Sequence, residues 1–263
     1  MRLCLDVGNS HLYGGVFAGN NLVLHFRHTS KGNTSDEWGV FLRCVLRENS
    51  CQPEEILAIS ICSVVPTLDQ SLRIACRNYF SIEPFFLQSG VKTGLNIRYD
   101  RPEDVGADRI ANAIAATNLF PDTALIVLDF GTATTFCAID AEKNYLGGAI
   151  LPGVHLALNA LSKNTAKLPS VDVVNVTKVV GASTVESIQS GVFYGALGAC
   201  RELICRIKND VFHESTVKVL ATGGLSFLFA SYGIYDQHLP DLVLHGLRLA
   251  AEMNEPMLPL KSN

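Results

Sequence analysis

The sequence has little charge and no long apolar run. Of its 263 residues, 17% are charged and 48% are hydrophobic, and no stretch of about 18 uncharged apolar residues occurs. We therefore expect no membrane-spanning helix, and the composition is that of a globular protein with a sizeable core. The formal net charge of −4 gives no electrostatic reason to expect nucleic acid or an anionic membrane as the main partner.

The eight cysteines include no C-x-x-C pair, and most of them lie inside apolar runs. This spacing disfavours a zinc site and favours reduced, buried thiols in a cytoplasmic protein. The chain reaches Asp6 after a single short strand, so we expect no signal peptide. The sequence also lacks the G-x-x-x-x-G-K-[ST] loop of P-loop enzymes, so any phosphate site must be built in another way.

One short motif occurs twice, 123 positions apart, in what reads as the same register. Without a gap, Asp6 aligns with Asp129, Gly8 with Gly131, Asn9 with Thr132 and Tyr13 with Phe136. Each copy is an apolar strand that ends in a carboxylate, followed by a glycine turn with small polar groups and a second strand. Two facing turns of this kind can hold the phosphates of a nucleotide and its metal between them.

The first turn runs from Asp6 to Ser10. Gly8 lets the backbone approach a ligand closely, and the neighbouring N–H groups can form an anion nest. Asp6 could hold Mg²⁺ directly or through water, since Mg²⁺ favours few carboxylates and several waters. An ordinary Asp-Gly hairpin turn is the alternative. The second copy of the motif favours a functional turn.

The second turn places hydroxyl groups beside Gly131, from Thr132, Thr134 and Thr135. Hydroxyls suit phosphate oxygens, and a carboxylate such as Asp129 among such oxygens can seat a monovalent cation. For Thr135 we prefer the simpler explanation of β-propensity at the start of a strand. Thr132 is the predicted ligand contact.

A helix is predicted to open at Gly106-Ala107-Asp108-Arg109. Asp108 in a first helical turn is often a cap, and Arg109 beside it could form a surface salt bridge. The functional alternative makes Asp108 a general base that accepts the proton of a substrate hydroxyl. Phosphoryl transfer passes through a loose transition state, so such a base needs no raised pKa. Arg109 would be a donor fork for a carboxylate or phosphate.

The periodicity predicts two α/β halves, each of the order β-β-β-α-β-α-β, at residues 1–105 and 106–255, with a tail at 256–263. Ser35 is the predicted N-cap of the first helix. In the first half the predicted strands are 2–6, 13–17, 22–27, 56–65 and 85–87, and the second helix is 68–79. In the second half the predicted strands are 124–129, 135–140, 145–151 and 217–221, with helices at 107–119 and 183–207.

Three further features have both an ordinary and a functional explanation. Gly223-Gly224 is either a tight turn or a place where adenine or ribose meets bare backbone. The glycines at 191, 195 and 198 indicate a close helix contact, within the chain or across a dimer. The segment with Lys163 and Lys167 is predicted to be a solvated loop, with phosphate contact as the alternative.

Taken together, these motifs resemble those of type III pantothenate kinases, within the superfamily of acetate and sugar kinases, Hsp70 and actin. The order matches over nearly the whole chain, to about residue 250, and Gly106–Arg109 is the most discriminating element. The matching segments are Asp6–Ser10, Ser63–Pro66, Gly106–Arg109, Asp129–Thr134, Gly148–Gly153 and Ala221–Gly224.

The resemblance implies duplicated actin-like (ribonuclease H-like) halves that face a central nucleotide cleft. It also implies ATP-dependent phosphorylation of the primary hydroxyl of pantothenate, the first step of coenzyme A synthesis. The implied ATP contacts are Asp6, Val7, Gly8, Asn9, Ser10, His11, Leu12, Tyr13 and Thr132. The implied pantothenate contacts are Tyr99, Gly106, Ala107, Asp108, Arg109 and Thr184, with Asp108 as the catalytic base.

The resemblance further implies that Asp129 holds K⁺ or NH₄⁺, that Mg²⁺ accompanies ATP, and that the protein is a homodimer. Ser10 stands where the family commonly has threonine, which keeps the hydroxyl. Two rival functions remain: a kinase of this fold for a sugar or small carboxylate, and a non-catalytic regulatory relative. The latter would be expected to lose Asp6, Asp108 or Asp129, or to gain a basic face.

Overall fold

The computed structural model describes residues 1–30, 33–213 and 216–255, which form two compact units. The first unit comprises Met1–Leu95, Asp100–Ala115 and the described part of Leu242–Asn263. The second comprises Asn96–Tyr99 and Ala116–Asp241. The predicted halves follow the sequence repeat, but three segments belong to the other compact unit: 96–99 to the second unit, and 106–115 and 242–255 to the first. The predicted tail at 256–263 lies outside the described residues.

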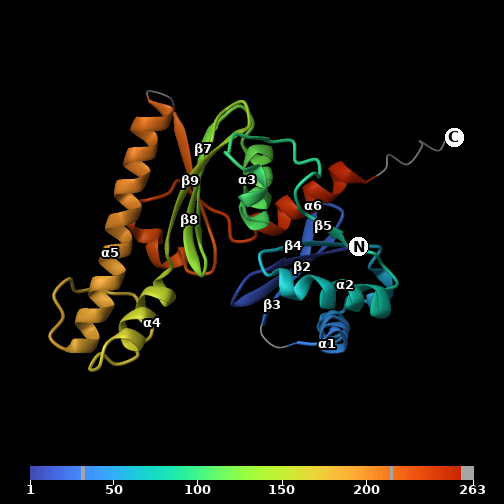
Figure 1. Ribbon diagram of the computed structural model, residues 1–263, viewed down its shortest axis with the longest axis horizontal. Helices are drawn as coiled ribbons and strands as arrows, with labels where there is room; N and C mark the ends of the chain where they lie inside the picture. Colours follow the sequence, from blue (N-terminus) through green and yellow to red (C-terminus); the bar gives the residue numbers. More distant parts are fainter. Residues whose placement is uncertain (31–32, 214–215, 256–263) are drawn as a thin grey trace. The chain divides into compact units, whose positions relative to one another are not determined.

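Each unit is built around one β-sheet (Figure 1). The strands are β1 Arg2–Val7, β2 His11–Ala18, β3 Asn21–Thr29, β4 Ala58–Ser63, β5 Phe85–Phe86, β6 Asn96–Ile97, β7 Ala124–Phe130, β8 Ala133–Ile139, β9 Asn144–Pro152, β10 Val217–Thr222 and β11 Gln237–His238. The α-helices are α1 Ser35–Glu48, α2 Pro66–Phe80, α3 Ala107–Leu119, α4 Val154–Asn164, α5 Thr184–Ile207 and α6 Leu242–Asn254. Short helical turns are η1 Pro53–Glu55, η2 Pro102–Asp104, η3 Lys208–Phe212 and η4 Ser226–Tyr232.

The two sheets share one strand order, which confirms the predicted duplication. The first sheet is ordered β3-β2-β1-β4-β5, and the second repeats this as β9-β8-β7-β10-β11, with β6 added beside β9. In both sheets the first three strands pair antiparallel and the fourth pairs parallel with the first. A parallel pair places the ends of its strands at one edge of the sheet. The turns after β1 and β7 therefore occupy equivalent edges of their own sheets.

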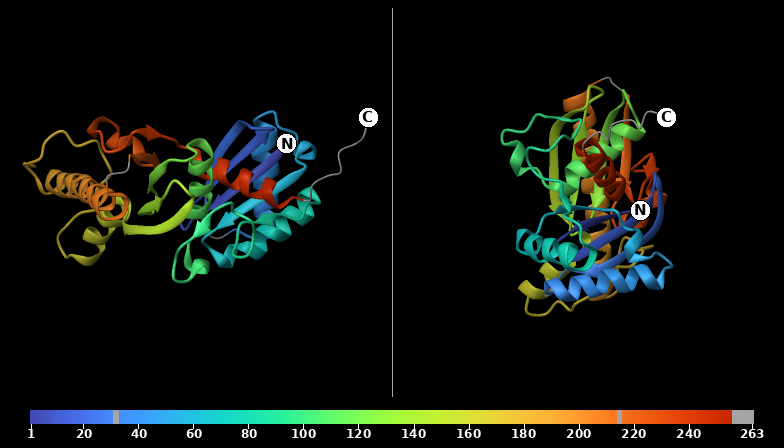
Figure 2. Two further views of the ribbon diagram at one scale, coloured as in Figure 1. Left: turned by 90° about the horizontal axis from the view of Figure 1, so that it is seen from above. Right: turned by 90° about the vertical axis from the view of Figure 1, so that its right-hand side faces the viewer.

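In the first unit, α1 and α2 lie side by side on one face of the sheet, and α6 lies on the other (Figures 1 and 2). The capping prediction for α1 was wrong by one residue. Thr34 is the N-cap, because its hydroxyl accepts from the Glu37 N–H while the Glu37 carboxylate accepts from the Thr34 N–H. Pro66 begins α2 rather than only ending the strand, since a proline at the first helical position forfeits no hydrogen bond.

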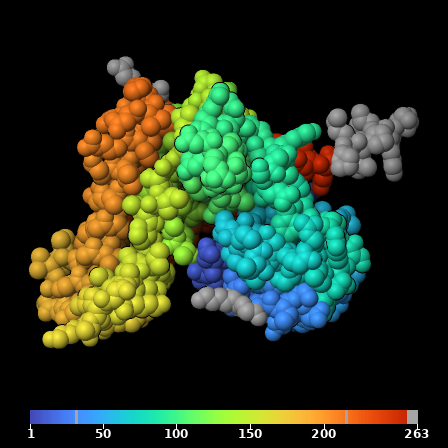
Figure 3. Space-filling view, viewed as in Figure 1, coloured from blue at the N-terminus to red at the C-terminus, as the bar shows by residue number. Residues whose placement is uncertain are grey.

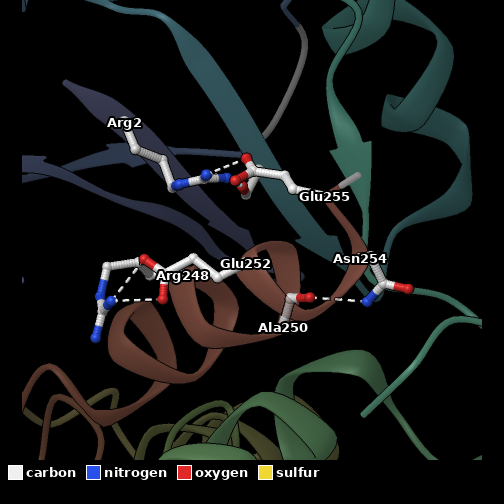
Figure 4. Close-up of polar contacts among 7 residues, drawn as sticks. Arg2, Arg248, Ala250, Glu252, Asn254 and Glu255 are labelled. Carbon is white, nitrogen blue, oxygen red and sulfur yellow. Dashed lines mark hydrogen bonds and ion pairs between the residues drawn. The ribbon is translucent and has the colours of Figure 1, made fainter. Parts of the chain in front are cut away.

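Helix α6 was not predicted, and it returns the end of the chain to the first unit. Within α6, Arg248 binds the Glu252 carboxylate at 2.7 and 2.8 Å, and after its end Glu255 pairs with Arg2 of β1 (Figure 4). Gly246 lets α6 approach α3 closely: a Cβ there would lie 1.7 Å from the Ala111 carbonyl oxygen. The α3 segment that carries Asp108 is thereby packed against a second helix.

In the second unit, α4 and α5 lie together and cover the sheet through Leu158, Phe193 and Leu197 (Figure 2). The expected loop at Lys163 was wrong, since Lys163 occupies the last turn of α4. A lysine there complements the helix dipole, which is a structural reason for its charge. None of the helices in the described ranges combines the length and the apolar character that a membrane crossing requires.

Candidate active site

The first turn connects β1 to β2 and begins at Asp6, whose Cα pairs with Tyr13 across the two strands. The Gly8 N–H donates to the His11 carbonyl at 3.0 Å, which closes the turn around Asn9 and Ser10. Asn9 is exposed and Ser10 partly buried, so both polar side chains can reach a ligand. Val7 and Leu12 are fully buried, so only their backbone could take part in binding.

Tyr13, the β2 partner of Asp6, is fixed by contacts with two neighbouring side chains. Its ring lies under the Arg27 guanidinium, 4.5 Å from the ring centroid, and its hydroxyl is 3.0 Å from His25 Nδ1. Arg27 is the β3 partner of Tyr13 in the strand register. Two neighbouring side chains therefore restrict the aromatic ring, and one positive charge lies close to the predicted phosphate turn.

The two copies of the motif are not equivalent beyond the turn. Gly8 donates to His11, three residues on, whereas Gly131 donates to Ala133, only two residues on. Accordingly Asp6 pairs with Tyr13, but Asp129 pairs with Thr135. The gapless alignment of Tyr13 with Phe136 was therefore wrong, because the second turn is one residue shorter and shifts the register of the following strand by one.

Cys62 is a residue of this region to which the sequence analysis assigned no role. It is the β4 partner of Asp6 in the parallel register, its side chain is 0% exposed, and its thiol donates to Asp6 Oδ1 at 3.2 Å. Burial, and then the negative charge of Asp6, raise the pKa of the Cys62 thiol well above its usual range. The thiol therefore keeps its proton. The only signal in the sequence was its position directly before the motif Ser63–Pro66.

Asp108 lies in the first turn of α3, in the same unit as Asp6. Its Oδ1 accepts from the Arg109 N–H at 2.8 Å, so it does bind a free N–H at the helix start, as a cap would. Burial nevertheless raises the pKa of the Asp108 carboxyl above its usual range, against the lowering effect of that N–H and of the Arg109 charge. Such a carboxyl is a stronger proton acceptor once ionised than an ordinary surface aspartate.

Two neighbours define the surroundings of Asp108. Gly106 leaves room for its carboxylate, since a Cβ there would lie 2.6 Å from Asp108 Oδ1. Arg109 is only 6% exposed, which rules out the alternative of a surface salt bridge. Its buried guanidinium lies directly beside Asp108 in the chain and is suited to a planar anion.

The second turn lies in the second unit and is enclosed by glycines. Gly223, at φ +87°, has room for no side chain, because a Cβ there would lie 2.4 Å from Asp129 Oδ1 and 2.5 Å from the Phe130 nitrogen. Gly153 lies against the turn from the other side: its N–H donates to the Thr132 carbonyl at 3.1 Å. The Asp129 carboxylate therefore lies against the bare backbone of Gly223, and the Thr132 side chain is exposed.

Ala107 begins α3 in the first unit, whereas the predicted contacts Tyr99 and Thr184 belong to the second. The Tyr99 ring packs edge-on against Tyr145, with centroids 6.5 Å apart, and beside Gly147. Thr184 is the exposed first residue of α5, whose N-cap Ser183 accepts from the Glu186 N–H. Asp6, Cys62, Asp108 and Arg109 all belong to the first unit. That the two turns face a common cleft stays a prediction.

The carboxylates of Asp6 and Asp129 are suitable ligands for the two ions that the resemblance implies, Mg²⁺ and a monovalent cation. Asp6 offers carboxylate oxygen, which Mg²⁺ takes in small number together with phosphate oxygens and water. Asp129 lies beside a space that a Cβ at Gly223 would fill, and its carboxylate oxygen is a suitable ligand for a monovalent ion there. Within the described part of the chain, no three His, Cys, Asp or Glu side chains gather as a metal site.

Comparison with known proteins identifies the family. Residues 2–206 match the family model of the type III pantothenate kinases. A type III pantothenate kinase of Legionella pneumophila (strain Corby) is 65% identical over 254 residues, which cover 97% of this chain and 99% of the relative. One from Elusimicrobium minutum is 48% identical over 255 residues, with 97% and 99% covered.

A solved structure from Campylobacter jejuni, described as a Baf family transcriptional activator, superposes with a TM-score of 0.59 at 20% identity, covering 96% of this chain and 98% of that one. At that identity the likeness shows a shared fold and no more, so it gives the regulatory hypothesis no support. The family model and the curated relatives, in contrast, cover most of the sequence. The chain therefore belongs to the type III pantothenate kinase family.

Proposed function

We propose that this protein transfers the γ-phosphoryl group of ATP to the primary hydroxyl of pantothenate, giving 4'-phosphopantothenate and ADP. The observation that carries the proposal is the partly buried Asp108, with its raised pKa, beside the buried Arg109. Family membership supplies the acceptor. All three carboxylates that a non-catalytic relative would be expected to lose are present.

In this mechanism Asp108 accepts the proton of the pantothenate hydroxyl as its oxygen attacks the γ-phosphorus. The transition state is loose, so the main contribution of the protein is positioning and charge stabilisation. Arg109 pairs with the pantothenate carboxylate, while Tyr99, Gly106, Ala107 and Thr184 complete the acceptor site. These assignments rest on the match of sequence motifs together with the chemistry of each side chain.

For the nucleotide, we propose that the turn residues from Asp6 to Tyr13 and Thr132 contact the phosphates. The N–H groups around Gly8 and the hydroxyl groups of Ser10 and Thr132 are suitable donors. Mg²⁺, held by Asp6 directly or through water, supplies positive charge to the phosphates when bound. Asp129 seats K⁺ or NH₄⁺.

The first test is a coupled assay of ADP release with pantothenate present and absent, in K⁺ and in Na⁺. We expect release only with pantothenate, ATP and Mg²⁺ together, and faster release in K⁺. A screen of sugars and small carboxylates at fixed ATP serves as the control for acceptor identity. Equal ADP release with a sugar would contradict the assignment of pantothenate as the acceptor. Equal rates in K⁺ and Na⁺ would contradict the proposed role of Asp129 in cation binding.

We further propose a homodimer formed through one face of α5. The exposed Gly191, Gly195 and Gly198 fall on one side of that helix, and a methyl group at any of them would meet no atom within 4 Å among the described residues. The three glycines therefore make no close contact with another part of the described chain. Each glycine costs about 1 kcal/mol of helix stability, and a close contact with a second copy of α5 would explain why they are there. In the space-filling view, α5 (orange) lies at the surface over much of its length (Figure 3).

Light scattering after size-exclusion chromatography tests the dimer. We expect a mass of twice 28.5 kDa for the unaltered protein and a single-chain mass for Gly195→Glu, because a charged side chain would block close approach. Arg206→Ala, at an exposed position of the same helix, should leave the mass at the dimer value. A Gly195→Glu protein that stays dimeric would place the interface elsewhere.

A cytoplasmic location is also proposed. Six of the eight cysteines are buried, and all eight are free thiols. Free thiols in this number are typical of a reducing compartment. The substrates ATP and pantothenate agree with that assignment.

A further inference from the structure

We propose that Cys62 is a positioning residue for the nucleotide site: its thiol holds the Asp6 carboxylate in one orientation and so strengthens the binding of Mg·ATP. The inference rests on the proposed role of Asp6 toward Mg·ATP. It is carried by the 3.2 Å hydrogen bond from Cys62 Sγ to Asp6 Oδ1 and by the complete burial of the Cys62 side chain.

The direction of this hydrogen bond is fixed by chemistry. An ionised carboxylate can only accept, so the thiol must be the donor. The terminal torsion of an aspartate side chain is broad and close to two-fold, so packing alone defines its carboxylate plane poorly. The Cys62 thiol, a buried donor on the neighbouring strand, restrains that plane.

The strand register gives this donor a fixed position. Asp6 on β1 lies between Tyr13 on β2 and Cys62 on β4, as direct cross-strand partners. Direct partners in a sheet lie close enough for their side chains to interact on one face. Tyr13 is itself held by Arg27 and His25. Asp6 therefore has an ordered neighbour on each side, and the Cys62 thiol donates a hydrogen bond to its carboxylate.

A neutral donor suits this place better than a charged one. The Cys62 thiol is fully buried and contacts the Asp6 carboxylate directly. A lysine or arginine there would form an ion pair with Asp6 and compete with Mg²⁺ for it. The thiol orients the carboxylate and leaves its negative charge in place.

The test compares Cys62→Val, which keeps the approximate volume without a donor, with Cys62→Ser, which keeps a donor. Calorimetric titration with Mg·ATP, without pantothenate, is the readout. We expect the dissociation constant to rise about tenfold in Cys62→Val and to change less than about twofold in Cys62→Ser. Cys76→Val, at another fully buried thiol of the same unit, is the control for core packing and should bind as the unaltered protein does.

A second comparison shows whether Cys62 acts through Asp6. In an Asp6→Ala background, Cys62→Val should cause no further loss of affinity, because the acceptor of the Cys62 hydrogen bond is gone. A full tenfold loss in that background, or unaltered binding by Cys62→Val, would overturn the proposal. If Cys62→Val fails to fold, Cys62→Ala against Cys62→Ser decides on the same criterion.

The outcomes also separate this inference from the proposed function. A protein that binds Mg·ATP but does not phosphorylate pantothenate would refute the acceptor assignment and leave the Cys62 comparison valid. An unaltered protein that binds no Mg·ATP would refute both. Normal kinase activity with equal Mg·ATP affinity in all Cys62 variants would refute only the role of Cys62.

Discussion

Replacing Asp108 by asparagine is expected to lower kcat with pantothenate about 10²- to 10⁴-fold, the usual contribution of a general base. Asparagine keeps the acceptor for the Arg109 N–H, so the start of α3 should be preserved. The dissociation constant of Mg·ATP should change by less than about threefold, since the nucleotide turn is untouched. Steady-state assays and calorimetry measure the two effects separately.

The same substitution should make the protein more stable at neutral pH. Because burial raises the pKa of Asp108 in the folded state, the unfolded chain loses this proton at a lower pH than the folded protein does. In the unaltered protein, the contribution of Asp108 to the free energy of unfolding is fully present below the ordinary aspartate pKa. It is lost as the pH rises through the raised pKa of the folded state. Asparagine cannot ionise, so its advantage should be present at pH 7 and absent below about pH 4.

Asp104→Asn is the matched control for both measurements. Asp104 lies four residues earlier, is exposed, and pairs with Arg101 at 3.6 Å. Its removal should lower neither kcat nor the free energy of unfolding at pH 7 noticeably, because an exposed ion pair contributes little. Near-normal turnover in Asp108→Asn would remove Asp108 as the base, and a loss of stability at pH 7 would contradict the assigned cause of its raised pKa.

Replacing Gly223 by alanine is expected to destabilise the protein by about 2 to 4 kcal/mol and to weaken activation by K⁺. Alanine at φ +87° is strained, and its Cβ would lie 2.4 Å from Asp129 Oδ1 and 2.5 Å from the Phe130 nitrogen. The backbone nitrogen cannot move without disturbing β7, so the carboxylate must shift. Urea unfolding measures the first effect, and the half-saturating K⁺ concentration of the kinase assay measures the second.

Gly233→Ala separates strain from collision. Gly233 also has positive φ, +62°, but a Cβ there would meet nothing within 4 Å. It should cost only about 1 to 2 kcal/mol, the penalty for a left-handed conformation, and leave the K⁺ dependence unchanged. If Gly223→Ala behaved like Gly233→Ala in both assays, the position of the Asp129 carboxylate would not depend on its close contact with Gly223.

Local patterns in the sequence were enough for most of the fold. Alternating and continuous apolar runs located every strand of the first sheet and all of the second except the short β6 and β11. Helix α3 was predicted with the bounds Ala107–Leu119 that the structure has. Helices α4 and α6 were missed. Their place is decided by packing, as where Gly246 meets Ala111, and no local pattern reports such a contact.

The candidate site divides in the same way. Asp6, Asp108 and Asp129 were identified from motifs, because a carboxylate at a strand end or a helix start leaves a signal within a few residues. The partner of Asp6 could not be found in that way, since Cys62 is 56 residues away and meets it only through the parallel pairing of β1 with β4. The one-residue difference between the two turns is likewise a matter of strand register.

The sequence by itself determined the duplicated α/β architecture and the family motifs, and it supplied the three candidate carboxylates Asp6, Asp108 and Asp129. These depend on periodicity and on residue type at short spacing, which the chain displays directly. Only the tertiary structure decided the environment of each carboxylate: burial beside Arg109 for Asp108, a thiol donor for Asp6, and a wall of glycine backbone for Asp129. The physical reason is that desolvation, hydrogen bonding and steric room depend on atoms brought together from distant parts of the chain.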